Sequence, residues 1–168
     1  MIPSGGTGRT MKRNGFSLIE LLVVIGIMSA LISMAGLAYS TWMNRYRLEG
    51  QVKEMLVDIM NARAQAMQKN VTYFMVVAAN NYSVIEDTNE NGVPNPNAGD
   101  KSVITNKTLK YQSNWVNTIT MNTRGIVSPQ DMISFNTGGA TAEVDCISLD
   151  VTRIRIGRLN GSNVCVPR

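Results

Sequence analysis

The chain has 168 residues, of which 44% are hydrophobic, and this is enough for one domain of ordinary size with a modest core. Its formal net charge is +4, but Arg9, Lys12 and Arg13 supply three of the cations, so the rest of the chain is nearly neutral and lacks the overall basic character of a nucleic-acid-binding domain. The sequence contains no histidine, which excludes Ser-His and Cys-His catalysis, and it assembles no other convincing catalytic group.

Residues 16–39 form a long apolar stretch directly after a basic segment. Glu20 is its one charged side chain, and the next charge along the chain is Arg45. A stretch of this length exceeds the roughly 20 residues that a helix needs to span a bilayer. A carboxylate inside the membrane costs on the order of 3 kcal/mol even on permissive insertion scales. We therefore expect a membrane helix in which Glu20 has a specific partner.

The junction between the basic and apolar segments carries a specific motif. Residues 12–20 read KRNGFSLIE, and this run resembles the class III signal of type IV pilins and type II secretion pseudopilins. The resemblance implies that a prepilin peptidase cuts after Gly15 and removes the leader, residues 1–15. It also implies that the new amino group of Phe16 is methylated, and that Glu20 is the fifth residue of the mature chain.

In that family the mature helices of many subunits pack into the core of a filament. The resemblance therefore implies other pilins or pseudopilins as partners, and pairing of Glu20 with the Phe16 amine of a neighbouring subunit. The physical chemistry agrees, because a carboxylate and an ammonium in hydrocarbon each need a counter-charge.

The alternative is an ordinary secretory signal peptide or a plain membrane anchor. A secretory apolar region has about 7 to 15 residues and is followed by a small-residue cut site, for which Gly36-Leu37-Ala38 is a candidate. The length of the run and the carboxylate of Glu20 favour the prepilin interpretation. The basic leader favours a cytoplasmic N-terminus and export of the residues after the apolar helix. We thus expect a protein of the bacterial inner membrane with an exported C-terminal domain, which later enters a pilus or pseudopilus filament.

From residue 41 the pattern becomes amphipathic and predicts that the helix continues from its membrane part, residues 16–40, to about Lys69. Apolar residues recur in this second part, residues 41–69, at spacings of three and four, and we expect them to face a sheet. They are Leu48, Val52, Met55, Leu56, Ile59, Met60 and Met67.

Residues 70–168 predict an exported antiparallel β domain, because short runs rich in β-branched and aromatic residues alternate with turn signals. The first two runs read as a hairpin with Asn80-Asn81 at its turn. The expected fold class is α+β and type IV pilin-like, with the long N-terminal helix packed on an antiparallel sheet. The predicted strands are 71–79, 82–86, 102–111, 116–122, 132–136, 144–149 and 151–156.

The segment after the predicted hairpin resembles the opening of a calcium loop. Asp87, Asn89 and Asn91 offer oxygen ligands at alternate positions, and Gly92 stands at the sixth position, where such loops turn sharply. The closing acid is expected at position 98, which is alanine, and Asp100 comes two residues later. The sequence leaves two interpretations open, a calcium site of different shape or a plain polar connection between strands.

Cys146 and Cys165 are the only two cysteines, and both lie in the part that we expect to be exported. An even count in an oxidising compartment predicts a disulfide. A loop of this size would stabilise the domain by on the order of 3 kcal/mol in the chain-entropy model.

Alternation along the last predicted strand places Arg153 and Arg155 on one face, with Arg158 shortly after them. The pattern resembles the C-terminal Gly-Arg-x-Arg signature of GspH/FimT-type minor pilins, some of which bind DNA during uptake, although Thr152 stands in the place of that glycine. Two roles follow from the resemblance: a structural pilin or pseudopilin subunit, or a DNA receptor that uses these arginines. The plain alternative is that the arginines are solvated edge residues.

Overall fold

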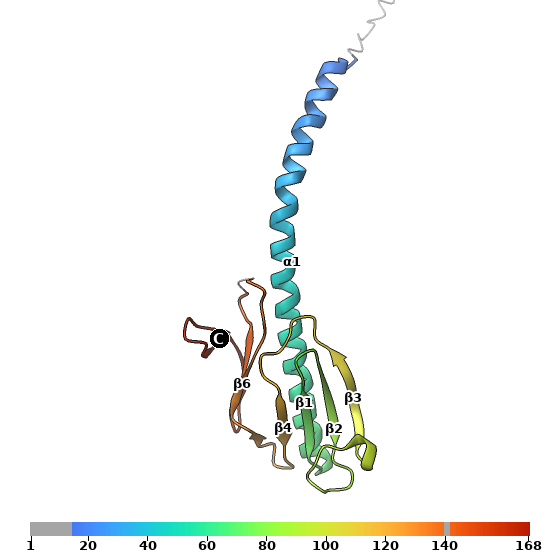
Figure 1. Cartoon of the computed structure of the whole chain (residues 1–168), viewed down its shortest axis with the longest axis vertical. Coiled ribbons are helices and arrows are strands. Elements are labelled where there is room, and N and C mark those ends of the chain that lie inside the picture. The colour runs from blue at the N-terminus through green and yellow to red at the C-terminus, as the bar shows by residue number, and fades with distance from the viewer. Residues whose placement is uncertain (1–14, 140–141) are drawn as a thin grey trace, which may run out of the picture. The chain divides into compact units, whose positions relative to one another are not determined.

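The computed structural model describes residues 15–139 and 142–168, so all of the predicted leader, residues 1–15, except Gly15 lies outside the described residues. The chain divides into two compact units, Met1–Ser40 and Thr41–Arg168. One helix is followed by nine strands and a single 3-10 turn among the described residues (Figure 1). The elements are α1 Leu18–Lys69, β1 Tyr73–Val77, β2 Asn81–Glu86, η1 Pro96–Ala98, β3 Lys101–Thr108, β4 Asn117–Met121, β5 Val127–Ser128, β6 Asp131–Ser134, β7 Cys146–Leu149, β8 Ile154–Leu159 and β9 Cys165–Pro167.

The predicted long helix is confirmed. α1 runs for 52 residues and is helical through Gly26, Gly36 and Gly50. It ends where Asn70 adopts a left-handed conformation, with φ 56°. The backbone N–H of Val71 then donates to the carbonyl of Ala66. This is a common way to terminate a helix, because the left-handed residue satisfies carbonyls of the last turn.

The strands form two antiparallel sheets rather than the single sheet that the sequence predicted. The first has the order β3-β2-β1-β4-β5 and the second β6-β7-β8-β9. One isolated antiparallel bridge, between Ser113 and Phe135, joins the segment between β3 and β4 to the residue that follows β6. The predicted hairpin is confirmed, since β1 and β2 pair in register from Tyr73 opposite Glu86 to Val77 opposite Tyr82.

The last predicted strand, 151–156, is displaced in the structure, where β8 begins at Ile154. Val151 and Thr152 instead form the turn between β7 and β8, in which the N–H of Asp150 donates to the carbonyl of Arg153 at 2.9 Å. The β-branched residues of this turn gave it the appearance of a strand. The two shortest strands, β5 and β9, were not predicted, because two or three residues are too few to show an alternating pattern.

The core lies between the C-terminal part of α1 and the sheets (Figure 1). The helix contributes a stripe of side chains that are at most 2% exposed and recur every three or four residues. Met60 and Met67 lie outside this stripe and are 46% and 48% exposed, so their predicted place in the core was wrong. Small residues complete the stripe in the last turns and let the sheets approach closely. Its members are Leu48, Val52, Met55, Ile59, Ala62 and Ala66.

Candidate functional site

The predicted processing site lies immediately before α1. Residues Gly15, Phe16 and Ser17 are not helical, and the helix begins at Leu18. The Phe16 side chain is 84% exposed, and a Cβ built on Gly15 would meet no atom within 4 Å. The described part of this junction is therefore exposed and lies outside the helix.

Glu20 is exposed and lies in the first turn of α1. A carboxylate there is favoured by the partial positive charge of the unpaired N–H groups at a helix N-terminus. The amino group that processing would create at Phe16 would lie at this same end of the helix. The structure thus brings the two predicted assembly groups into neighbouring positions of one chain.

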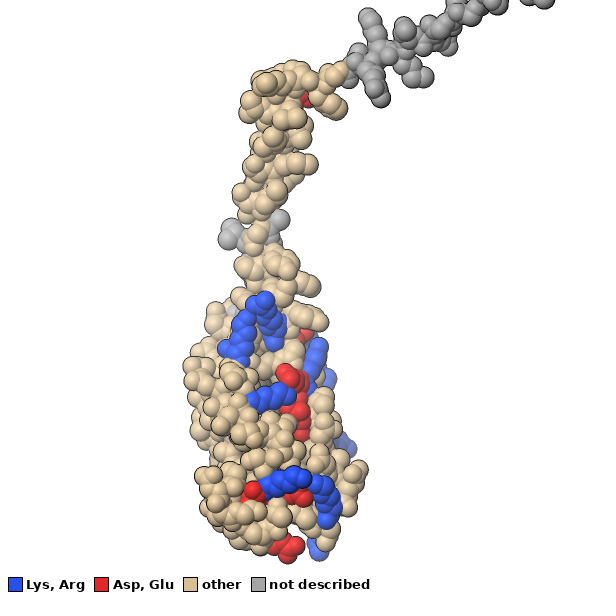
Figure 2. All heavy atoms as spheres, turned by 90° about the vertical axis from the view of Figure 1, so that its right-hand side faces the viewer, with Lys and Arg blue, Asp and Glu red and all other residues tan. Residues whose placement is uncertain are grey.

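The N-terminal part of α1 presents an apolar surface on every side. Its large apolar side chains range from 46% exposed at Val24 to 84% at Phe16. Ser29 and Ser33 donate to the carbonyls of Ile25 and Ser29 within the helix, so their hydroxyls add little polarity. By length and composition α1 can cross a membrane. Figure 2 shows this part as an almost uncharged surface.

The second unit, residues 41–168, carries charged side chains of both signs close together (Figure 2). Two networks tie α1 to the first sheet. In the first, Lys107 forms ion pairs with Asp58 at 2.6 Å and Glu54 at 2.8 Å, and the Tyr82 hydroxyl donates to Asp58 at 2.5 Å. Burial and the hydrogen bond to Asp58 raise the pKa of Tyr82. Burial alone would lower the pKa of Lys107, but its bonds to Asp58 and Glu54 raise it.

The second network lies at the end of α1. Lys69 forms an ion pair with Glu86 at 2.8 Å, and the Tyr73 hydroxyl donates to the same Glu86 oxygen at 2.8 Å. The bond from Lys69 lowers the pKa of Glu86, and that bond also raises the pKa of Lys69. Both networks hold the helix against the sheet, and neither forms an open site for a ligand.

The structure separates the three predicted phosphate-binding arginines. Arg153 is exposed and belongs to the β7–β8 turn rather than to a strand. Arg155 lies on β8 and pairs with Asp150 at 3.2 Å. Arg158 is half-buried and three positions further along β8, so strand alternation places it on the other face from Arg155. Thr152 stands in the place of the glycine of the Gly-Arg-x-Arg signature, and it is not among the described residues with positive φ. This turn therefore does not require a glycine at that position.

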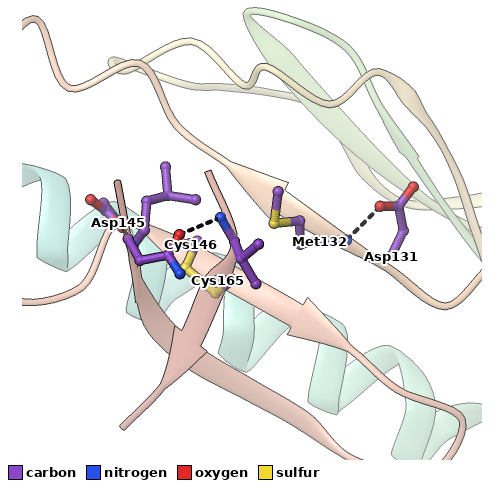
Figure 3. The surroundings of a disulfide bond; sticks show 8 residues. Asp131, Met132, Asp145, Cys146 and Cys165 are labelled. Atoms are coloured by element: carbon purple, nitrogen blue, oxygen red, sulfur yellow. Dashed lines mark hydrogen bonds between the residues drawn. A yellow bond between two sulfur atoms is a disulfide. The ribbon is translucent and has the colours of Figure 1, made fainter. Parts of the chain in front are cut away.

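The predicted disulfide is confirmed, with the Cα atoms of Cys146 and Cys165 5.9 Å apart. Cys146 begins β7 and Cys165 begins β9, and β8 lies between these strands in the sheet (Figure 3). The bond therefore links two strands that are not hydrogen-bonded neighbours. It joins the C-terminal end of the chain to the body of the second sheet.

The residues of the predicted calcium loop accept hydrogen bonds from the loop backbone. The Asp87 carboxylate accepts the N–H groups of Asn91 and Gly92 at 3.1 and 3.0 Å. The side-chain oxygens of Asn89 and Asn91 accept the N–H groups of Asn91 and Val93. Within residues 15–139 and 142–168, no three Asp, Glu, His or Cys side chains gather as a metal-binding group.

Sequence reasoning did not single out Arg63. This residue of α1 donates from Nε to the carbonyl of Gly125 at 2.7 Å and from Nη1 to that of Thr152 at 2.9 Å. Gly125 precedes β5 of the first sheet, and Thr152 lies in a turn of the second. One helical side chain thus connects both sheets. Arg63 is half-buried beside the apolar stripe of α1. The sequence gave no signal of its role, because its partners are backbone carbonyls and no residue type marks these.

Comparison with known proteins identifies the N-terminal segment. Residues 10–36 match the family model described as the prokaryotic N-terminal methylation motif, which is the prepilin signature of type IV pilins and pseudopilins. No curated protein and no solved structure gave a significant match to the chain. Together with the long helix, the antiparallel sheets and the disulfide, the motif supports a pilin or pseudopilin subunit, which is a structural rather than an enzymatic class of protein.

Proposed function

We propose that this chain, which carries the prepilin methylation motif and the α+β pilin-like layout, is a minor pilin or pseudopilin of the GspH/FimT type. It is a structural subunit of a type IV pilus or a type II secretion pseudopilus. Before assembly the subunit lies in the inner membrane with its C-terminal domain exported, and α1 then packs into the core of the filament. A prepilin peptidase prepares it by cutting between Gly15 and Phe16.

The observation that carries this proposal is the exposed apolar end of α1 together with the motif at its start. Every described large apolar side chain from Phe16 to Met34 is at least 46% exposed. An apolar surface of this extent needs either lipid or other protein against it. Lipid covers it in the membrane, and the helices of neighbouring subunits cover it in the filament.

The assembly contact is the pairing of Glu20 with the Phe16 amine of the next subunit. In hydrocarbon each of these charges is costly alone, so the subunits are most stable where both are paired. Glu20 would therefore fix the position of one subunit relative to the next, and it would do so only in the assembled filament. Replacing it removes an unpaired polar group from the membrane form, so the free subunit should be at least as stable.

The experiment compares incorporation of Glu20→Ala and unmodified protein into filaments recovered from cells. We expect Glu20→Ala to be processed to Phe16 and retained in the membrane but depleted from filaments. Ser29→Ala is the matched control, because its hydroxyl is satisfied within its own helix by Ile25, and it should be incorporated normally. Equal incorporation of Glu20→Ala and the unmodified protein would refute the pairing role.

The alternative function is a DNA receptor that uses Arg153, Arg155 and Arg158. Its support is weaker, since Arg155 is already paired with Asp150 and the three side chains do not share one face. Binding to phosphates releases counterions, so DNA affinity must fall steeply with salt. A DNA titration at rising salt with an Arg153→Ala/Arg155→Ala double variant separates the two functions, because filament incorporation should not depend on these arginines.

A further inference from the structure

The loop between β2 and β3 begins and ends with a buried aspartate. β2 and β3 pair with Ile85 opposite Ser102 and Glu86 opposite Lys101. The next step of the same register places Asp87 opposite Asp100, at the neck of the loop. Asp87 is 3% exposed and Asp100 is 7% exposed. The two buried aspartates thus occupy opposite positions directly beyond the last printed strand pair, Glu86 and Lys101.

These carboxylates have unequal hydrogen bonding. Both oxygens of Asp87 accept backbone N–H groups. In Asp100, Oδ2 accepts the N–H of Asn95 at 2.8 Å, whereas Oδ1 is buried without a partner. The N–H of Asp100 also donates to the carbonyl of Asn95 at 3.4 Å, so Asp100 is bonded to the loop from both its backbone and its side chain. Asp100 directly precedes β3, so this unpartnered oxygen is buried at the base of the loop.

In the described part of the chain, the charges of these two acids are not neutralised by an ion pair. Among the ion pairs of residues 15–139 and 142–168, none includes Asp87 or Asp100. A buried carboxylate oxygen without any partner is costly, and Asp100 Oδ1 is such an oxygen. One divalent cation would neutralise both charges and occupy the empty acceptor site on Asp100.

The remaining donors in the loop are oxygen atoms. Asn89 and Asn91 each use their side-chain oxygen for one backbone N–H, and an amide oxygen has a second lone pair for a cation. Gly92, with φ 73°, makes a sharp turn in which its N–H bonds to Asp87, and the Asn89 side chain donates from Nδ2 to the carbonyl of Ala98 at 3.0 Å. A set of carboxylate and amide oxygens without nitrogen or sulfur suits Ca²⁺.

We propose that residues 87–100 bind one Ca²⁺ ion, with Asp87 and Asp100 as the charged ligands and the amide oxygens of Asn89 and Asn91 beside them. The expected closing position, Ala98, lies in η1, and pairing of β2 with β3 supplies the acid at Asp100 instead. Two carboxylates are few for a calcium site, so we expect a Kd of about 10⁻⁴ to 10⁻³ M, as in extracellular modules.

The test uses the full chain in detergent micelles after removal of divalent ions with a chelator. Calorimetric titration with CaCl₂ should show one ion per chain in that affinity range, and MgCl₂ should bind much more weakly because Mg²⁺ demands a stricter octahedral geometry. Hydrogen exchange should show calcium-dependent protection of residues 87–100. Asp100→Asn should weaken calcium binding by about tenfold or more, because it removes one of two charged ligands.

Asp150→Asn is the matched control, since it makes the same chemical change at an exposed carboxylate outside the loop, and it should bind calcium normally. If Asp100→Asn does not fold, Asn91→Ala replaces it, because this side chain is exposed, and binding should weaken severalfold. The proposal is overturned by absence of calcium binding up to about 10 mM. It is equally overturned by unchanged affinity in the loop variants, or by protection that appears outside residues 87–100.

Discussion

Gly157 lies directly opposite Cys146 in the second sheet, and a Cβ added to it would come within 3.0 Å of the partner sulfur, Cys165 Sγ. The same Cβ would also clash with the backbone carbonyl of Val166. The disulfide crosses β8 at the one residue of that strand without a side chain. This relationship explains why a glycine occupies a buried position of β8.

We expect Gly157→Ala to destabilise the domain by about 1–3 kcal/mol, because overpacking against backbone atoms forces the strands apart. Denaturant unfolding of the full chain in detergent measures the change. Gly161→Ala is the control, since a Cβ there would meet no atom within 4 Å, and it should be nearly neutral. Equal stability of the two variants would contradict the steric explanation.

The mature protein should begin at Phe16 and carry a methyl group on its amine. The reason is the methylation motif at residues 10–36, which contains the Gly15-Phe16 junction. Intact mass spectrometry of protein from the membrane fraction checks both features at once. A mature chain that starts at Tyr39, after Gly36-Leu37-Ala38, would instead identify an ordinary secretory signal peptide.

The Lys69–Glu86 pair should make stability sensitive to acid. The pKa of Glu86 is lower in the folded than in the unfolded chain, so its contribution is present above the unfolded value of about 4.3 and is lost as the pH falls through the folded value. The pKa of Lys69 is raised in the folded chain, so its contribution to stability is present at acidic and neutral pH and is lost only as the pH rises above about 10.4.

Unfolding curves between pH 3 and 7 should therefore show a loss of stability below about pH 4.5 that is smaller in Glu86→Gln. The control is Glu90→Gln, an exposed residue for which no ion pair occurs among the described residues. Its acid sensitivity should match that of the unmodified protein. An unchanged acid response in Glu86→Gln would show that the pair does not contribute.

Arg63→Met should destabilise the sheets and the helix packed on them by roughly 1–3 kcal/mol, because two backbone carbonyls lose a charged donor while the apolar stem remains. Denaturant unfolding gives the magnitude, and hydrogen exchange should show faster opening near Gly125 and Thr152. Arg47→Met, an exposed change on the same helix, should have little effect. If exchange at both turns stays unchanged, Arg63 does not connect the sheets.

Local sequence patterns predicted much of this fold. The apolar run and the amphipathic repeat after it span more than ten helical turns. The hydrogen bonds of a helix join residues only four positions apart, so local sequence was enough to predict α1 almost to its ends. The first hairpin was equally predictable, since two alternating runs flank a short polar turn. The disulfide followed from the cysteine count, because two cysteines allow only one pairing.

Tertiary structure decided the rest, because strand partners are chosen by contacts between residues far apart in the sequence. The division into two sheets, the passage of the disulfide over Gly157 and the bonds of Arg63 to two distant turns all depend on such contacts. The same holds for Asp100, which the sequence left open as a ligand in a loop of different shape and which the β2–β3 register places opposite Asp87. The sequence by itself determined the helix, its processing motif and the chemical nature of the donors, and only the packed sheets determined which of those donors meet.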